Sequence, residues 1–141
     1  PLRGLEFVTK KITYSIARII ANKQKTLYLG NIKAKRDWGF AGDYVKAMWL
    51  MLQQKKPSDY VIATGKSHSV EDFLIEAFEY AGLGDWKKYV KIDKKLIRPQ
   101  DIDNLIGDSS MAKKEIGWEP TVQYNDLIKL MVDDDLKLVE K

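Results

Sequence analysis

Cysteine is absent from the 141 residues of the chain, and histidine occurs once. Without thiols the chain cannot form a disulfide framework, a thiolate metal site or a cysteine nucleophile. A metal site built from several histidines is excluded as well. The lack of cysteine is typical of a reducing compartment, so we expect a cytoplasmic protein. The longest apolar run, residues 47–52, is far shorter than the ~20 residues that span a bilayer, so we expect no membrane partner.

Two sequence patterns that accompany nucleotide chemistry are also missing. There is no Gly-x-Gly-x-x-Gly after a predicted strand and no Gly-x-x-x-x-Gly-Lys-Ser/Thr, the loops that cradle nucleotide phosphates. None of the seven tyrosines has a lysine four residues further on, so the pair in which lysine lowers a tyrosine's pKa for base catalysis is absent. We therefore expect no complete catalytic apparatus in these residues, and we expect them to belong to a longer protein.

The apolar spacing predicts helices that alternate with short strands. Predicted helices cover residues 4–22, 43–53, 70–81, 110–116 and the segment from 124 or 125 onward, and predicted strands cover Thr26–Leu29, Tyr60–Ala63 and Tyr89–Ile92. Residues 32–40 resemble a polar turn. Ser69 and Asp72 form a capping box that opens the third helix, and a glycine follows the third and fourth helices. The alternation indicates an α/β chain, mostly helical with short strands, in which residues 1–141 form one domain.

Positive charge is concentrated at the start of the chain. Residues 1–36 contain nine Lys or Arg and one acid, a net charge of +8, whereas residues 37–141 carry a net charge of −4. A basic segment of this kind indicates a polyanionic or phosphate-bearing partner, and the alternative is a solvated helix face. Lys10 and Lys11, on the polar side of the first helix, and the acidic run Asp133–Asp135 are expected to face solvent.

The densest polar cluster with an aromatic neighbour is Lys35-Arg36-Asp37-Trp38. A guanidinium can hold a phosphate through two parallel hydrogen bonds, and a neighbouring acid can orient it, so Arg36 is a candidate anion ligand. The alternative is an ordinary surface triplet. Arg98 is kept extended by the proline that follows it, and it points into a cleft or lies in an exposed loop. His68 is expected to pack or cap locally, and Trp118 to anchor the core.

Several longer stretches carry a pattern that is specific enough to compare with a family. They are Leu-Gly-Asn at 29–31, Arg-Asp-Trp-Gly at 36–39, Ala-Met-Trp-Leu-Met-Leu-Gln at 47–53, Tyr-Val-Ile-Ala-Thr-Gly at 60–65 and Gly-Trp-Glu-Pro at 117–120. The Arg-Asp and Gly-Trp-x-Pro elements alone resemble the wide group of extended short-chain dehydrogenases/reductases. The long run from 29 to 53 resembles the GDP-mannose 4,6-dehydratases more narrowly, and this resemblance extends over essentially the whole chain.

The resemblance implies a two-part enzyme. An N-terminal Rossmann domain binds NADP and carries the catalytic groups, and a smaller C-terminal part binds the sugar nucleotide. Residues 1–141 resemble only the C-terminal part of this Rossmann-like superfamily, so we expect them to be inactive alone. In this family the cofactor oxidises C4 of the mannose of GDP-mannose, water leaves across C5 and C6, and the hydride returns to C6. The product is GDP-4-keto-6-deoxy-mannose, and the full-length enzyme is expected to be a homo-oligomer.

The same resemblance implies a set of substrate-binding residues. Lys11 matches the lysine that reaches the guanine, and Asn31 lies in the matching Leu-Gly-Asn near the nucleotide. Arg36 matches an arginine on the diphosphate, and Arg98 matches a second phosphate-contacting arginine. Asp101 stands where relatives usually have a glutamate that contacts the ribose, and its side chain is one methylene shorter.

Three alternative functions remain open at this point. The first is another nucleotide-sugar epimerase, dehydratase or reductase of the same superfamily. The second is a non-catalytic binding remnant or partner subunit. The third is a basic module for nucleic acid, but no nucleic-acid motif accompanies the basic segment, so we expect no nucleic-acid partner.

Overall fold

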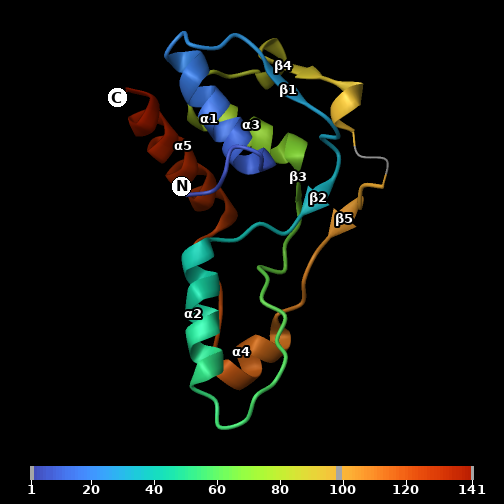
Figure 1. The fold of residues 1–141 in the computed structure, drawn as a ribbon, viewed down its shortest axis with the longest axis vertical. Helices are drawn as coiled ribbons and strands as arrows, with labels where there is room; N and C mark the ends of the chain where they lie inside the picture. Colours follow the sequence, from blue (N-terminus) through green and yellow to red (C-terminus); the bar gives the residue numbers. More distant parts are fainter. Residues whose placement is uncertain (1, 98–99, 141) are drawn as a thin grey trace.

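The computed structural model describes residues 2–97 and 100–140, in which helices are joined by short strands (Figure 1). The α-helices are α1 (Val8–Ile20), α2 (Ala41–Leu52), α3 (Val70–Tyr80), α4 (Ser110–Ile116) and α5 (Tyr124–Glu140). The strands are β1 (Leu27–Leu29), β2 (Lys35–Arg36), β3 (His68–Ser69), β4 (Val90–Ile92) and β5 (Asn104–Leu105), and short 3-10 turns form η1 (Trp86–Lys88) and η2 (Lys94–Leu96). In these ranges no helix is long and apolar enough to cross a membrane.

The main core lies where α1, α3 and α5 pack together beside the parallel strands β1 and β4 (Figure 1). Apolar side chains recur at helical spacing on the inner faces, as Ile12 and Ile16 do on α1 and Ile128 and Val132 do on α5. Phe73 of α3 is equally buried. Burying a side chain of this size contributes about 1.5–3 kcal/mol relative to leaving it exposed, so these contacts hold the three helices together.

A second, smaller core lies at the other end of the molecule, where α2 and α4 meet (Figure 1). Trp118 is 1% exposed there beside Ala47 and Ala112, and its indole Nε1 donates to the Asp43 carbonyl at 2.7 Å. The Asp43 carboxylate also holds the chain after Trp118, since it accepts the N–H and the hydroxyl of Thr121 at 2.9 and 2.6 Å. The expectation that Trp118 anchors the core is confirmed.

A short three-stranded sheet, in the order β3-β2-β5, lies between the two ends. Strand β2 runs antiparallel to β3, with Lys35 opposite Ser69, and parallel to β5, with Lys35 opposite Asn104. The prediction of a turn over residues 32–40 is therefore wrong at residues 35 and 36. A strand of two residues is too short to show the alternation of apolar and polar residues by which strands are recognised in a sequence.

Local signals set several helix ends as predicted. The capping box is confirmed, because the Ser69 hydroxyl accepts the Asp72 N–H at 3.0 Å and the Asp72 carboxylate accepts the Ser69 N–H at 2.8 Å. Gly117 ends α4 at φ 65°, a left-handed conformation that glycine adopts without steric cost. Helix α1 begins at Val8 rather than at residue 4. Glycine is a poor helix former, so Gly4 does not favour an earlier start of the helix. No side chain caps the first turn of α1 at Phe7.

The predicted strand Tyr60–Ala63 is not formed. The structure gives these residues no strand and no backbone hydrogen bond to another described residue. Ala63 is buried against Gly107 instead, so closely that a Cβ on Gly107 would lie 2.3 Å from the Cβ of Ala63. A strand requires a paired neighbour, and the sequence of one segment does not show whether that neighbour is present.

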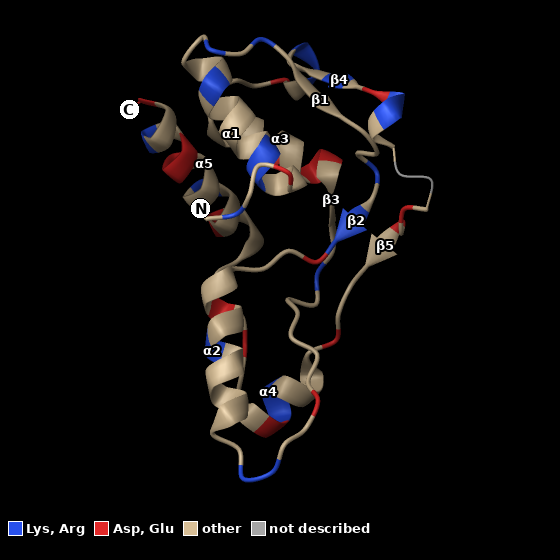
Figure 2. Ribbon diagram, viewed as in Figure 1, with Lys and Arg blue, Asp and Glu red and all other residues tan. Residues whose placement is uncertain are grey.

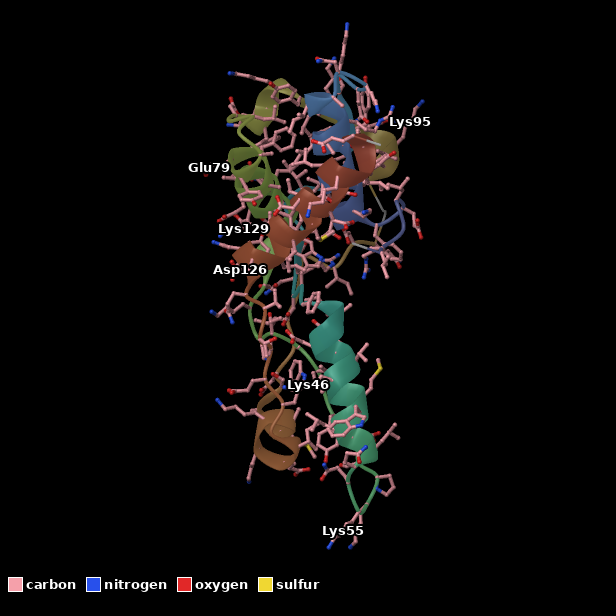
Figure 3. The ribbon with its side chains drawn as sticks, turned by 90° about the vertical axis from the view of Figure 1, so that its left-hand side faces the viewer. Lys46, Lys55, Glu79, Lys95, Asp126 and Lys129 are labelled. Atoms are coloured by element: carbon pink, nitrogen blue, oxygen red, sulfur yellow. The ribbon has the colours of Figure 1, made fainter. Side chains whose placement is uncertain are left out.

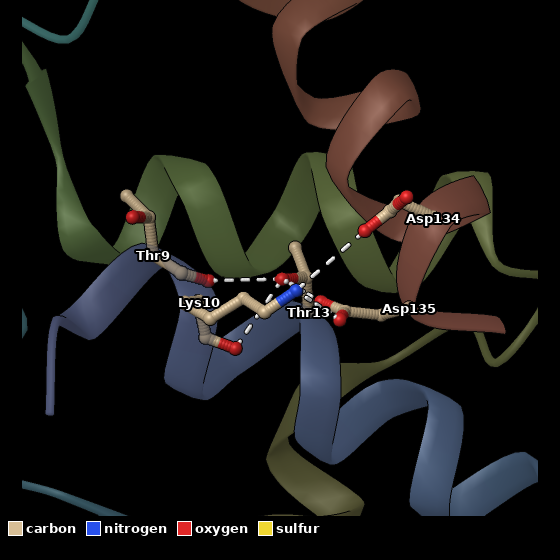
Figure 4. Close-up of polar contacts among 5 residues, drawn as sticks. All are labelled: Thr9, Lys10, Thr13, Asp134 and Asp135. Carbon is tan, nitrogen blue, oxygen red and sulfur yellow. Dashed lines mark hydrogen bonds and ion pairs between the residues drawn. The ribbon is translucent and has the colours of Figure 1, made fainter. Parts of the chain in front are cut away.

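The expectation that Lys10 and Asp135 face solvent is wrong. The two side chains form an ion pair between α1 and α5, with Lys10 Nζ 2.5 Å from Asp135 Oδ1 (Figure 4). Lys10 is 5% exposed and Asp135 is 0% exposed. Thr13 donates its hydroxyl to the other Asp135 oxygen at 2.6 Å. Asp135 follows Val132 by three positions, so helical spacing places it on the apolar face of α5.

Candidate functional site

The guanidinium of Arg36 projects from the end of β2 toward the segment before β5. Its Nη2 donates to Asp101 Oδ1 at 2.6 Å, and its Nη1 donates to the carbonyls of Lys35 and Ile102 at 2.7 and 2.5 Å. The Arg36 side chain remains 27% exposed and that of Asp101 19% exposed. The parallel pairing of β2 with β5 creates this contact, because it brings residues 101–105 alongside Arg36. The result is a guanidinium held on one edge and partly open on the other.

Asn31 joins the same cluster from the loop after β1. Its Nδ2 donates to Asp101 Oδ2 at 3.2 Å, while its Oδ1 accepts the Lys33 N–H at 2.9 Å. One carboxylate therefore receives hydrogen bonds from both Asn31 and Arg36. The structure brings together three of the predicted substrate-binding residues, Asn31, Arg36 and Asp101.

Gly30 explains how the end of β1 comes so close to the segment that leads to Asp101. A Cβ on Gly30 would lie 2.4 Å from the Leu96 carbonyl oxygen, so only glycine allows this approach. The Leu29 carbonyl also accepts the Asp93 N–H at 2.8 Å. The space beside Gly30 is thus filled by the chain itself. Gly30 therefore serves the close packing of these two segments and does not form a phosphate-cradling loop after β1.

Of the other two predicted residues, Lys11 lies outside this cluster. Lys11 lies on α1 and its Nζ donates to the Tyr28 carbonyl at 2.7 Å, three residues before Asn31. Lys11 is expected to face solvent; its side chain is partly buried, and its exposed ammonium also bonds a carbonyl of β1. Arg98 lies outside the described residues.

The Asp37 carboxylate connects β2 to two loops, a role that the sequence did not indicate. Its Oδ1 accepts the N–H and the hydroxyl of Thr64 at 3.0 and 2.6 Å, and its Oδ2 accepts the N–H groups of Gly65 and Gly107 at 2.9 and 3.4 Å. Asp37 therefore ties two distant loops to the end of β2. It does not pair with Arg36, so the acid that orients the guanidinium comes from elsewhere in the sequence.

A hollow of about 300 Å³ has Trp38, His68 and Tyr124 in its wall. The rings of His68 and Tyr124 stack with centroids 3.6 Å apart, which confirms that His68 packs locally. Burial, with Asp72 and Glu76 nearby, raises the pKa of the Tyr124 hydroxyl. Lys11, Asn31, Arg36 and Asp101, the predicted substrate-binding residues that the structure describes, do not line this hollow.

Opposite charges meet at the cluster. Figure 2 shows the basic strand β2 beside an acidic stretch directly before β5. Lys33 forms a further ion pair with Glu71 of α3. The positive charge that the sequence concentrates in its first 36 residues is therefore partly neutralised by acids from later segments.

The chain matches one family of known proteins along most of its length. The family model described as GDP-mannose 4,6 dehydratase matches residues 1–131. The chain is 57% identical over 141 residues to GDP-mannose 4,6 dehydratase 1 of Arabidopsis thaliana, covering 100% of this chain and 39% of that protein. It is 42% identical to the GDP-mannose 4,6 dehydratase of Homo sapiens, covering 99% of this chain and 42% of that protein. The chain thus spans less than half the length of these curated relatives.

Solved structures show the same fold at much lower identity. The chain resembles RMD from Pseudomonas aeruginosa, solved with NADPH, with a TM-score of 0.87 and 18% identity over 98% of this chain and 45% of that chain. It resembles the dTDP-glucose 4,6-dehydratase of Bacillus anthracis, solved with NAD, with a TM-score of 0.82 and 18% identity over 99% of this chain and 42% of that chain. The predicted fold class, the C-terminal region of an extended short-chain dehydrogenase/reductase, is confirmed.

Proposed function

Because the chain belongs to the GDP-mannose 4,6 dehydratase family, we propose that it is the sugar-nucleotide-binding part of an enzyme that converts GDP-mannose to GDP-4-keto-6-deoxy-mannose. The observation that carries this proposal is the partly exposed Arg36 guanidinium, which is oriented by two backbone carbonyls and by Asp101. A guanidinium fixed in this way is suited to a diphosphate, because its fork matches phosphate oxygens without further ordering.

The neighbours of Arg36 supply the remaining proposed contacts. Asn31, at 3.2 Å from Asp101, places an amide beside the same anion site. We assign Lys11 to the guanine and Arg98 to a second phosphate contact. In this arrangement Lys11 keeps its bond to the Tyr28 carbonyl and donates another of its three N–H groups to a guanine acceptor.

The cofactor and the catalytic groups belong, in this proposal, to a Rossmann part outside these residues. NADP is the cofactor that we assign to that part. It supplies the reversible hydride transfer at the sugar, and the residues described here contribute only the binding and orientation of the nucleotide. The whole enzyme is proposed to be a cytoplasmic homo-oligomer.

Helix α2 offers the surface on which the Rossmann part is proposed to pack. Its Val45, Met48, Trp49 and Leu52 are 62%, 60%, 59% and 82% exposed. Figure 3 shows α2 extending away from the end that carries Glu79 and Lys95. Apolar side chains exposed together in this way mark an interaction surface. The neighbouring residues 60–63, with their unpaired backbone, would gain a strand partner in the same contact.

The test is nucleotide binding by the full-length protein and by its Arg36→Lys variant. Lysine keeps the positive charge but cannot form two parallel hydrogen bonds to a phosphate. We therefore expect the Kd for GDP to rise roughly tenfold or more, which corresponds to the loss of one hydrogen bond to a charged group. Arg18→Lys is the matched control, because Arg18 lies in the last turn of α1 and donates to the Lys23 carbonyl just beyond the helix. It should leave the Kd for GDP unchanged.

Two results would contradict the proposal in different ways. Unchanged GDP affinity in Arg36→Lys would show that the diphosphate lies elsewhere. A preference of the wild type for UDP or dTDP sugars over GDP sugars would favour another enzyme of the superfamily. Conversion of GDP-mannose by the full-length protein with NADP would exclude a non-catalytic remnant.

A further inference from the structure

We infer that a surface of lysines beside the candidate site steers the anionic nucleotide toward Arg36 and speeds its association. This inference rests on the proposed function, because it takes the nucleotide diphosphate as the ligand. Six side chains make up the lysine surface, and they belong to the loop before β1 and to η1, β4 and η2. They are Lys25, Lys87, Lys88, Lys91, Lys94 and Lys95.

Positive charge is concentrated at the lysine surface, where all six side chains are exposed. Residues 85–95 contain five lysines and two acids, a net charge of +3, whereas residues 37–141 as a whole carry −4. Lys25 lies beside this segment, because the Leu27 N–H donates to the Tyr89 carbonyl at 2.8 Å. Figure 2 shows the positive charge along β4 and η2. Grouped charges of one sign attract an oppositely charged ligand beyond contact distance, so this surface acts on anions in solution.

The two acids within this segment bond to the backbone and not to the lysine ammonium groups. Asp85 Oδ1 accepts the Lys87 N–H at 3.0 Å, and Asp93 Oδ1 accepts the Lys95 N–H at 2.9 Å. Among the described residues, no carboxylate forms an ion pair with an ammonium group of the lysine surface. The charge of this surface is therefore directed to solvent and not to partners within the chain.

The lysine surface continues into the candidate site. Strand β4 pairs with β1 so that Lys91 lies opposite Tyr28, whose carbonyl accepts the lysine that we assign to guanine. Turn η2 packs against Gly30, where a Cβ would lie 2.4 Å from the Leu96 carbonyl oxygen. The next residue after Gly30 is Asn31, a member of the candidate site. An anion that approaches the lysine surface is thus brought beside the groups proposed to bind it.

The chemistry of the ligand separates attraction from binding. The diphosphate of a nucleotide sugar is dianionic, whereas its base and hexose are neutral, so the field acts on the group that Arg36 is proposed to hold. A long, exposed lysine side chain loses conformational freedom when it is fixed in one contact. The lysine surface therefore attracts the diphosphate without a fixed bond to it, and Arg36 supplies the fixed hydrogen bonds.

The experiment measures the association and dissociation rate constants of GDP for the full-length protein by stopped-flow tryptophan fluorescence. Measurements at about 20 mM and about 0.5 M salt give Debye lengths of about 20 Å and about 4 Å. The test variant is Lys94→Gln with Lys95→Gln. The matched control is Lys55→Gln with Lys56→Gln, which removes the same charge from another exposed, adjacent pair. Figure 3 shows Lys55 and Lys95 at opposite ends of the molecule.

We expect the test variant to associate with GDP about threefold more slowly at low salt, with little change in its dissociation rate constant. Steering by all the charges of a surface changes association rates by about tenfold or more, and the variant removes two of the six lysines. Lys94→Glu with Lys95→Glu doubles the change in charge, so its association should be about tenfold slower. These differences should disappear at high salt, and the control should match the wild type at both salt concentrations.

Three results would overturn the inference. The first is wild-type association in both variants of Lys94 and Lys95 at low salt. The second is an equally slow association in the Lys55 and Lys56 control, which would indicate a general effect of net charge. The third is a loss that persists at high salt or that lies in faster dissociation, which would indicate a direct contact.

The proposed function is judged by separate results of the same measurements. If Arg36→Lys weakens GDP binding while the lysine variants associate normally, the proposed function stands and only the steering is refuted. If the lysine variants associate slowly while Arg36→Lys binds GDP as the wild type does, the steering stands and the diphosphate lies elsewhere. Failure of the wild type to bind GDP would refute both.

Discussion

Replacing Asp135 by alanine should destabilise the protein far more than replacing any exposed acid of α5. The Asp135 carboxylate is 0% exposed and receives the Lys10 ammonium at 2.5 Å and the Thr13 hydroxyl at 2.6 Å (Figure 4). The substitution removes this counter-charge from the buried ammonium of Lys10. The resulting loss arises mainly from the poor solvation of Lys10.

The size of the expected loss in unfolding free energy depends on the contacts that Lys10 and Thr13 keep in Asp135→Ala. Breaking a buried ion pair by removing one member costs about 3–5 kcal/mol. Asp134 stays 3.7 Å from Lys10 Nζ with its side chain 45% exposed, and the Thr13 hydroxyl retains contacts with the carbonyls of Thr9 and Lys10 at 3.2 and 3.3 Å. These contacts place the expected loss at the lower end, about 3 kcal/mol of unfolding free energy.

The assay is urea denaturation of the full-length protein followed by far-ultraviolet circular dichroism, together with hydrogen exchange of the α1 and α5 amides. Asp126→Ala is the matched control on the same helix. Its ion pair with Lys129 spans 3.5 Å between side chains that are 61% and 50% exposed, and such surface pairs contribute only about 0.2–1 kcal/mol. Faster exchange in α1 and α5 should accompany Asp135→Ala and not Asp126→Ala.

A loss in Asp135→Ala no larger than that of Asp126→Ala would refute the claim that this pair is buried and holds α1 to α5. A second variant, Lys10→Met with Asp135→Leu, tests the physical cause. Replacing both charges by apolar groups of similar size removes the desolvation cost along with the attraction, so its stability should return close to that of the wild type or exceed it. A double variant as unstable as Asp135→Ala would show that lost packing, and not an uncompensated charge, causes the effect.

Three further predictions concern packing, capping and pH. Gly107→Ala should lower stability by about 1–3 kcal/mol in the same urea assay, because the new Cβ would lie 2.3 Å from the Cβ of Ala63. Gly82→Ala is the control for backbone strain. At Gly82 a Cβ would meet no atom within 4 Å, but φ is 73°, so any loss there comes from the backbone conformation and not from overpacking. Ser69→Ala should cost about 1 kcal/mol, since it removes the acceptor for the Asp72 N–H at the start of α3, and an unchanged urea midpoint would contradict this capping role. Hydrogen bonding from Ser69 lowers the pKa of Asp72 below its ordinary 3.8. For Asp43, burial raises the pKa, but hydrogen bonds from Thr121 and Val122 outweigh it and the net pKa is also lowered. Both carboxylates thus contribute stability that is present above pH 3.8 and is lost as the pH falls through their lower folded-state pKa values. The stability difference between Asp72→Asn and the wild type, measured at pH 5 and again at pH 3, should therefore shrink at the lower pH.

Most helices could be predicted from the sequence because their signals are local. The Ser69 capping box and the glycine after α4 act within one helical turn, so they identify helix ends without knowledge of distant contacts. The family could also be recognised, because the run from 29 to 53 is long and specific. The candidate residues Asn31 and Arg36 followed from that run.

Partners that come from distant segments could not be predicted in the same way. Nothing near Arg36 in the sequence indicates that Asp101 would orient it, and the adjacent Asp37 was the more obvious choice. Arg36 ends β2 and Asp37 directly follows the strand. Arg36 reaches the candidate site, while Asp37 holds Thr64 and Gly107.

The sequence by itself determined the class of the fold, the amphipathic helices and the family, because these depend on composition, periodicity and local capping. Only the tertiary structure decided which charges are buried and which carboxylate meets which cation. Lys10 and Asp135 lie 125 positions apart in the chain and Arg36 and Asp101 lie 65 apart. Their pairing depends on how α1 packs on α5 and how β2 pairs with β5. The low-dielectric surroundings that strengthen the attraction between the paired charges exist only once those elements are assembled.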